Sequence, residues 1–348
     1  MKRFTMSACV LTTALLAAMN QTALPSTVLG TFDFYEAGGV GGFAVNPNGN
    51  QVYISEGMGG SSGLIRVNAS NPTAMTSQSL AYGGGVAVDV VTGRYATTNG
   101  YGDTLFVYNP DDTLYDSQPI TGIGGALAAG NGTFGISTQG NDTFQIYNEA
   151  SKTVTSLYHD PVGSNVAYNK ATGRYYWDRG QNGVVSADVF QESPPTYLGQ
   201  LSNIAVTSVN DITNQVYGIS NPGTGDVLNG STEAVEQTFS LGGHGDIVAD
   251  NKLDRIYIMG GSSGEILAYD GTGTTQLGAF TLPDGYIANE GVMADGDSRL
   301  YVDGYKTGVT DHRLFVLDTA SIPEPSALLL LGTGIVGLLA YAWRRRRV

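Results

Sequence analysis

The chain has 348 residues, of which 49 are glycine, 20 are tyrosine and only 14% are charged. This length can bury one large all-β domain or two ordinary ones, and the composition favours short strands over helices. Setting aside Lys2, Arg3, the four terminal arginines and Glu324 leaves 11 basic and 30 acidic residues in 27–322, a net charge near −19. So acidic a domain repels nucleic acid and anionic lipid, which excludes nucleic-acid binding but allows weak association with divalent cations.

The first 26 residues are typical of a secretory signal peptide. Lys2 and Arg3 form a basic start, and the apolar stretch 6–19 is too short to span a bilayer. Small and turn-forming residues follow, with Ala23 as one candidate cleavage point. Cys9 is the only cysteine and lies inside the apolar stretch, so we expect the exported domain to contain no disulfide.

A pattern of short strands repeats seven times between residues 27 and 320. Each repeat contains an apolar strand, a polar turn, a second strand with aromatic residues, a glycine-rich stretch and a third strand. The centres of the second strands recur every 39 to 44 residues, at Tyr53, Ala96, Gly135, Tyr176, Tyr217, Tyr257 and Tyr301. A period near 41 is that of a four-stranded propeller blade. The sequence therefore predicts an all-β fold, a seven-bladed β-propeller spanning residues 27–320.

The strands around each second strand support this prediction. First strands such as 43–45 and 86–88 follow glycines, as expected of inner strands crowded around a central channel. Third strands end in residues that favour turns, at Asn68, Asn109, Asn148, Asp270 and Asp318. The fifth repeat, near Val227 and Leu228, matches the pattern most weakly.

The N-terminal segment is expected to close the ring. Residues 28–32 are similar to 197–201 and 276–280, which we expect to be outer, fourth strands. The seventh repeat ends at Asp318 and has no outer strand of its own. The N-terminal segment would supply that strand and remove a sheet edge.

The repeat resembles that of the YVTN/NHL-type seven-bladed propellers over nearly all of residues 27–320. The likeness is one of architecture and repeat pattern, without a strict signature. That group includes binding scaffolds, lactonases and lyases, so the resemblance implies the fold and leaves the function open.

Three sets of side chains are candidates for a calcium site: Asn46 with Asn48 and Asn50, Asp111 with Asp112, and Asp295 with Asp297. A calcium loop needs several oxygens within ~2.3–2.6 Å of the ion. However, one position just after the first strand is polar in most repeats, at Asn46, Asp89, Asn169, Asp250 and Asp295. A recurring register favours hairpin-turn chemistry over metal ligation. We therefore assign no metal ligand and no cofactor.

The three histidines fall at different registers of the repeat. We expect His159 and His244 near outer-strand or inter-blade joins, and His312 in a long loop of the last repeat. His244, close to Asp246, could place an imidazole near the channel, where lyase- and lactonase-type propellers hold catalytic groups. A single histidine without an evident partner rarely makes an active site, so we assign no catalytic residue.

The last residues, 321–348, have a distinct organisation. Pro323, Glu324 and Pro325 precede eighteen uncharged residues, 326–343, which are just long enough to cross a membrane as a helix. Arg344, Arg345, Arg346 and Arg347 follow and would stay cytoplasmic by the positive-inside rule. Together these features resemble the PEP-CTERM signal of Gram-negative bacteria. The resemblance implies recognition at Pro323–Pro325 by an exosortase of the inner membrane, and delivery to the cell surface or extracellular matrix.

We therefore expect an exported, monomeric propeller that acts as a non-enzymatic binding module. Its expected partners are the exosortase and inner membrane during sorting, and afterwards extracellular polysaccharide or another surface protein. The alternative is a secreted metal-dependent hydrolase of lactonase or lyase type, with a divalent metal held by residues such as Asp246, Glu290 or His244. A purely structural role is the third possibility.

Overall fold

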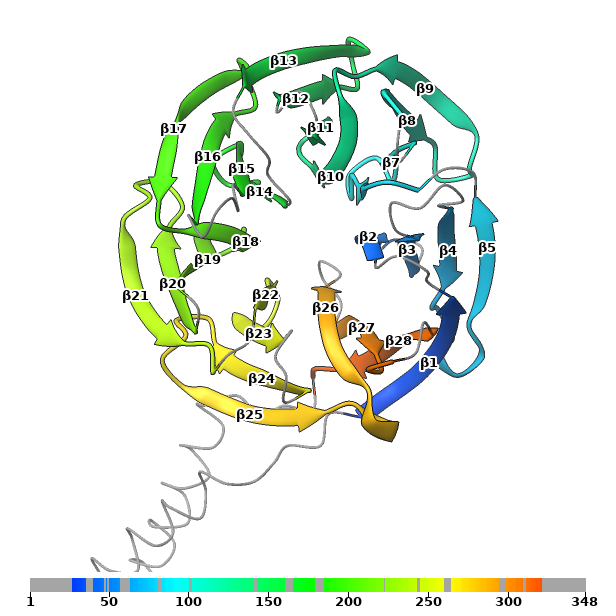
Figure 1. Ribbon diagram of the computed structural model, residues 1–348, viewed down its shortest axis with the longest axis vertical. Helices are drawn as coiled ribbons and strands as arrows, with labels where there is room; N and C mark the ends of the chain where they lie inside the picture. Colours follow the sequence, from blue (N-terminus) through cyan, green and yellow to red (C-terminus); the bar gives the residue numbers. More distant parts are fainter. Residues whose placement is uncertain are drawn as a thin grey trace, which may run out of the picture.

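Seven antiparallel sheets of four strands each surround a central channel in the computed structural model (Figure 1). The structure describes residues 27–35, 40–46, 48, 50–56, 63–80, 83–99, 102–139, 143–159, 165–178, 185–221, 223–242, 245–259, 264–293, 298–308 and 311–320. The seven-bladed propeller predicted from the repeat is thus confirmed.

The strands follow one another from the channel outward in each blade. Blades 1 and 2 contain β2 (Val40–Asn46), β3 (Gln51–Glu56), β4 (Leu64–Asn68) and β5 (Thr76–Leu80), then β6 (Val86–Val88), β7 (Tyr95–Thr98), β8 (Thr104–Tyr108) and β9 (Leu114–Pro119). Blades 3 and 4 contain β10 (Ile123–Ala129), β11 (Thr133–Gln139), β12 (Thr143–Asn148) and β13 (Thr153–His159), then β14 (Val166–Asn169), β15 (Arg174–Asp178), β16 (Ser186–Gln191) and β17 (Thr196–Ser202).

Blades 5 and 6 contain β18 (Ala205–Asn210), β19 (Gln215–Asn221), β20 (Thr224–Asn229) and β21 (Val235–Ser240), then β22 (Asp246–Asp250), β23 (Arg255–Met259), β24 (Glu265–Asp270) and β25 (Gln276–Thr281). Blade 7 contains β26 (Ile287–Met293), β27 (Arg299–Tyr305), β28 (Asp311–Asp318) and β1 (Thr27–Tyr35). The fifth repeat, which matched the pattern most weakly, forms a complete blade.

The second strand of each blade forms the core, as the repeat predicted. Its central triplet lies within β3, β7, β11, β15, β19, β23 or β27. Tyr53, Tyr176, Tyr217, Tyr257 and Tyr301 are all fully buried there. Blades pack face to face on both sides of these strands, which is why the triplets are apolar or aromatic rather than alternating.

The first and last parts of the propeller meet in blade 7. Strand β1 pairs antiparallel with β28, in a register that places Thr27 opposite Asp318 and Phe32 opposite Leu314. The N-terminal segment therefore closes the ring, as expected, and as the fourth strand of blade 7 it covers the edge of β28.

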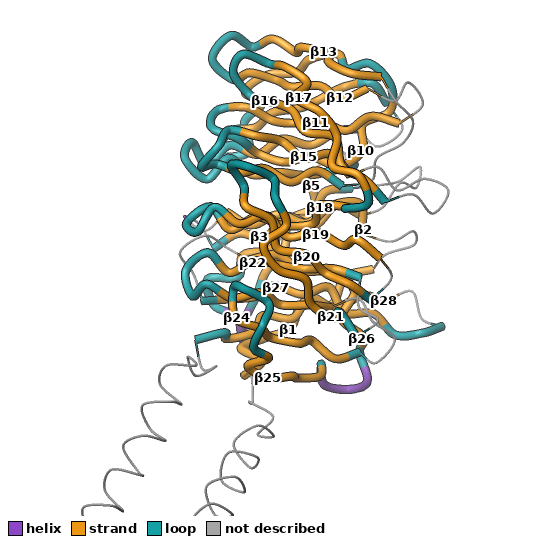
Figure 2. Tube along the Cα trace, turned by 90° about the vertical axis from the view of Figure 1, so that its left-hand side faces the viewer, coloured by secondary structure: helices purple, strands orange, loops and turns teal. Residues whose placement is uncertain are grey.

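The ring has two different faces. The turn face carries the tight turns between first and second strands and between third and fourth strands, such as 89–94, 170–173, 211–214, 109–113 and 230–234. The loop face carries the other connections. In the side view the described turns gather on one side of the disc (Figure 2). Because β1 begins and β28 ends at the turn face, both ends of the propeller leave from that face.

Carboxamide and carboxylate side chains shape the turns after the first strands. The Oδ1 atoms of Asn46, Asp89, Asn169 and Asp250 each accept a backbone N–H two residues further on, at 2.8–3.1 Å. Asn210, in blade 5, does the same with Ile212 at 3.0 Å. The recurring polar residue is thus turn chemistry at these positions, as its register indicated.

Arginines at the start of second strands link four of the seven blades to the next. Arg94 and Arg174 form ion pairs with Glu149 and Glu233, at 2.6 and 2.9 Å. Arg255 and Arg299 each donate to a backbone carbonyl, of Thr319 and Ala69 respectively, at 3.2 Å. All four acceptors lie in the turn after the third strand of the neighbouring blade. These contacts hold the turn face together as a ring.

Candidate functional site at the mouth of the channel

The channel is narrow because its first strands approach one another closely. A Cβ at Gly42 would lie 2.8 Å from the backbone nitrogen of Val86, and one at Gly85 would lie 2.1 Å from the carbonyl oxygen of Gly125. Real side chains do not tolerate such distances, so glycine is required where β2, β6 and β10 meet near the loop face. The expected role of glycine beside the channel is confirmed at these positions.

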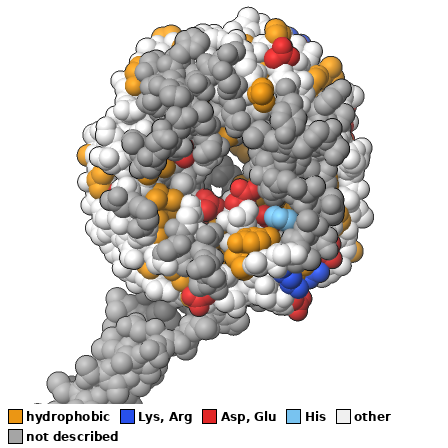
Figure 3. Space-filling view, in the orientation of Figure 1, with side chains coloured by type: hydrophobic (Ala, Val, Ile, Leu, Met, Phe, Trp, Pro, Cys, Tyr) orange, Lys and Arg blue, Asp and Glu red, His pale blue; other side chains and the backbone are white. Residues whose placement is uncertain are grey.

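The loop-face end of the channel opens into a cavity of about 700 Å³. First strands from around the ring line it, together with the ends of β15 and β19. Acidic side chains gather around this mouth in the space-filling view (Figure 3). Three of its lining residues are acidic, Asp178, Asp246 and Glu290, and they come from blades 4, 6 and 7. Asn165 and Asn289 add carboxamide groups to the same lining.

Burial changes the acidity of two of these carboxyl groups. Loss of contact with water raises the pKa of Asp178 to about 6. Burial also raises the pKa of Asp246 to about 6, against the opposing effect of backbone N–H groups, of which that of Gly291 lies 3.4 Å from Oδ2. One oxygen of Asp178, Oδ1, is buried and has no hydrogen-bond partner among the described residues. The mouth thus holds two carboxyl groups whose charged forms burial disfavours.

A chain of hydrogen bonds supports the mouth from blade 7. His312 Nδ1 lies 2.8 Å from Oδ1 of Asp303, which is 1% exposed. Asn289 donates from Nδ2 to the other oxygen of Asp303 at 3.1 Å. These hydrogen bonds join β28, β27 and β26 and fix Asn289 at the rim of the cavity. His312 therefore lies in strand β28, and the expectation that it lies in a loop was wrong, because β27 and β28 extend further than the apolar pattern indicated.

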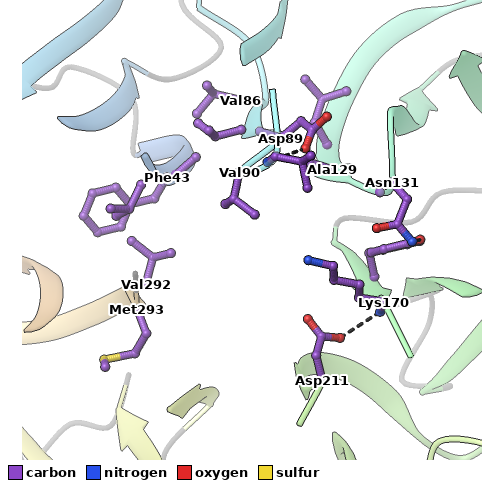
Figure 4. A pocket seen from close by; sticks show the side chains of 18 residues that line it. Phe43, Val86, Asp89, Val90, Ala129, Asn131, Lys170, Asp211, Val292 and Met293 are labelled. Atoms are coloured by element: carbon purple, nitrogen blue, oxygen red, sulfur yellow. Dashed lines mark hydrogen bonds between the residues drawn. The ribbon is translucent and has the colours of Figure 1, made fainter. Parts of the chain in front are cut away.

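The turn-face end of the channel is smaller and of mixed character. It holds a cavity of about 240 Å³, with Phe43, Val292 and Met293 on one side and Asn131, Lys170 and Asp211 on the other (Figure 4). The backbone N–H of Lys170 donates to Oδ1 of Asp211 at 2.7 Å, which links the turns of blades 4 and 5. The carboxylate of Asp211 is thus engaged in holding a turn.

The candidate calcium sets do not converge where they are described. Asn46 Oδ1 accepts the backbone N–H of Asn48, and the amide of Asn48 donates to the carbonyl of Val90. Asp111 caps Thr113, whose hydroxyl and N–H lower the pKa of that carboxyl, whereas Asp112 binds Arg66 and Tyr95. Asp295 and Asp297 lie outside the described residues. Among the described residues, no three His, Cys, Asp or Glu side chains come close enough to share a metal ion.

The remaining candidates divide between the cavity and the undescribed parts of the chain. Asp246 and Glu290 line the same cavity, as the hydrolase alternative requires, but His244 lies outside the described residues. His159 ends the outer strand β13, as expected. The sequence analysis did not find Asp178, Asp303 or Asn289. Asp178 could have been found, since it ends a second strand at the loop face after three consecutive buried aromatic residues.

Comparison with known proteins bears on the two parts of the chain separately. The propeller superimposes on the crystal structure of the Myceliophteria thermophila Cps50 (Swd1) β-propeller domain with a TM-score of 0.65 and 8% sequence identity. The match covers 84% of this chain and 99% of that domain. At this identity the likeness shows the fold alone. No curated protein sequence matches the chain.

Residues 321–347 match the PEP-CTERM protein-sorting motif. A chain with this motif is exported, passes the membrane, is processed by exosortase and is sorted to the cell surface. Pro323, Glu324, Pro325 and Arg344–Arg347 all fall within the match but outside the described residues. Within the described part of the chain, no helix is long and apolar enough to span a membrane.

Proposed function

We propose that this PEP-CTERM protein is a surface-displayed binding module whose ligand site is the loop-face cavity. The observation that carries the proposal is the meeting of Asp178, Asp246 and Glu290, from three blades, in one cavity of about 700 Å³. That volume lies within the usual range of small-ligand sites. Carboxylates held out of bulk water interact favourably with a ligand that donates hydrogen bonds to them.

Polysaccharide of the extracellular matrix is the ligand class that suits this lining. Sugar hydroxyls donate to carboxylate and carboxamide oxygens, which Asp178, Glu290 and Asn289 supply. The net charge near −19 disfavours anionic polymers unless a divalent cation bridges them, and favours neutral or amino sugars. The inner-membrane precursor, the cleavage at Pro323–Pro325, the Gram-negative host and the monomeric state belong to the same proposal.

Glycan binding by the full chain and by two matched variants tests this function. Asp178→Asn removes a carboxylate from the cavity, and Asp103→Asn removes an exposed one from the loop face outside it. We expect retention on matrix polysaccharide to fall about tenfold in the first variant and to stay unchanged in the second. Equal retention of both would exclude the cavity as the site, and retention only by a purified surface protein would replace polysaccharide with a protein ligand.

A metal-dependent hydrolase is the second candidate, because Asp246 and Glu290 share the cavity. Their carboxylates, with His244, are ligand types that a divalent cation accepts. The two functions differ in metal content and turnover. Binding without catalysis predicts no tightly held stoichiometric ion and no lactone turnover in the purified protein, whereas one ion lost together with activity in Asp246→Asn would establish the hydrolase.

A further inference from the structure

The direction in which the sorting tail leaves the propeller determines which face meets the membrane. The last described residue is Ala320, one position before the matched motif begins. Its backbone N–H donates to Asp318 Oδ1 at 2.9 Å. Thr319 is fully buried, and both its N–H and its hydroxyl donate to the carbonyl of Ser298, at 2.9 and 2.8 Å. The chain is therefore held against the turn face up to the start of the motif.

Arg255 strengthens this attachment from the neighbouring blade. Its guanidinium donates to the carbonyl of Thr319 at 3.2 Å, and its side chain is 2% exposed. Blades 6 and 7 thus both fix the exit point. Because residues 321–325 can span at most about 18 Å even when fully extended, the turn face cannot move far from a membrane that holds residue 326 onward.

The loop face is the more acidic of the two faces among the described side chains. Eight of the ten described basic side chains lie at the turn face beside at least eleven acidic ones: Arg66, Arg94, Lys152, Lys170, Arg174, Lys252, Arg255 and Arg299 against Asp89, Asp111, Asp112, Glu149, Glu192, Asp211, Glu233, Asp250, Asp254, Asp270 and Asp318. The described part of the loop face has Lys306 and Arg313 against Asp33, Asp103, Asp178, Asp246, Glu265, Asp284, Glu290 and Asp303. An anionic lipid surface therefore repels the loop face more strongly than the turn face. Lys152, Lys170 and Lys252 are exposed on the turn face.

We infer that the turn face is the surface that lies against the lipid membrane while the precursor is anchored, and that the mouth of the loop-face cavity is displayed away from it. The inference goes beyond the proposed ligand binding but rests on the proposed insertion of the tail. A seven-residue inner strand such as β10 spans about 23 Å. The mouth is therefore raised above the bilayer by the whole depth of the disc.

Site-directed fluorescence quenching tests this orientation, because the propeller contains no cysteine of its own. The full-length chain carrying Cys9→Ser is labelled at Ala171→Cys on the turn face or at Thr307→Cys on the loop face, both exposed positions. Each protein is reconstituted in phosphatidylethanolamine–phosphatidylglycerol vesicles that contain a lipid with a nitroxide headgroup. We expect at least twofold stronger quenching at position 171 than at position 307.

The outcomes separate the orientation from the insertion of the tail. Co-flotation with the vesicles together with equal quenching, or with stronger quenching at position 307, overturns the orientation while leaving the anchored tail intact. Failure to co-float overturns the insertion of the tail and the orientation with it. Insertion of twelve Gly and Ser residues after Ala320 is expected to remove the difference in quenching, and a difference that survives would overturn the short tether as its cause.

Discussion

The two faces of the propeller differ in the carboxyl groups that they hold beside the channel. On the turn face, carboxylates and carboxamides are paired: Asp112 with Arg66, Glu233 with Arg174, and Asn210 with its own turn. On the loop face, Oδ1 of Asp178 lies beside a large cavity and has no hydrogen-bond partner among the described residues. A carboxyl group with neither an ion pair nor a turn to cap costs stability, and a ligand is one explanation for its presence. The difference supports the proposal that one face holds the blades together and the other binds a ligand.

Replacing Arg255 breaks the turn-face ring where it holds the start of the sorting tail. Arg255→Ala removes a buried guanidinium from Thr319 and leaves a void between blades 6 and 7. We expect the free energy of unfolding to fall by about 3–4 kcal/mol, measured by urea denaturation. Ligand retention of the remaining folded protein should be unchanged.

The matched control lies on the loop face. Arg313 forms ion pairs with Asp33 and Asp284, both well exposed. Exposed ion pairs contribute little, so Arg313→Ala should cost less than about 1 kcal/mol. Equal losses in the two variants would contradict the view that stability is concentrated on the turn face.

Asp178→Asn changes the loop face and should stabilise the protein, in contrast to the replacement of Arg255 on the turn face. Burial raises the pKa of Asp178 to about 6, above its ordinary value of 3.8. The protonated carboxyl therefore contributes stability below about pH 4, and that contribution is lost as the pH rises through 6. We expect the free energy of unfolding of the Asn variant to exceed that of the wild type by about 2 kcal/mol at pH 7, and the difference to vanish near pH 4. A difference independent of pH would show that the carboxylate is satisfied.

Much of the turn face could be predicted from sequence, and little of the cavity. Asn46, Asp89, Asn169 and Asp250 recur at one register, because each caps a turn made by its own neighbours in the chain. The arginines could have been found in the same way, since Arg94, Arg174, Arg255 and Arg299 all stand two positions before the centre of their repeats. Their partners lie in the next blade, which local pattern does not show.

The register of the cavity residues is less regular. Asp246 and Glu290 both stand two positions before the first-strand residue that pairs with the centre of the repeat, and Asp178 stands two positions after the centre, as Asp303 does in blade 7. In other blades the place of Asp246 and Glu290 is taken by Gly42, Gly85 or Asn165, so the acidic residues do not stand out in the repeat. Closure of the ring places residues of blades 4, 6 and 7 around one cavity. For the same reason Asp303 reaches His312 only through the pairing of β27 with β28.

Asn210 tests the contribution of a single turn cap and a single hydrogen bond between neighbouring blades on the turn face. Its Oδ1 accepts N–H groups of Ile212 and Thr213 at 3.0 and 3.2 Å, and its Nδ2 donates to Asp254 of the next blade at 3.1 Å. Asn210→Ala removes both the turn cap and the link between blades, and we expect a loss of about 1–2 kcal/mol in thermal or urea unfolding. Asn210→Asp keeps the cap but places a second carboxylate against Asp254. The loss of unfolding free energy in Asn210→Asp should therefore be larger at pH 7 than at pH 4, where protonation of a carboxylate restores a hydrogen-bond donor. If Asp proved as stable as Asn at both pH values, the inter-blade hydrogen bond would contribute nothing, and the ring of turns would be held by the arginines alone.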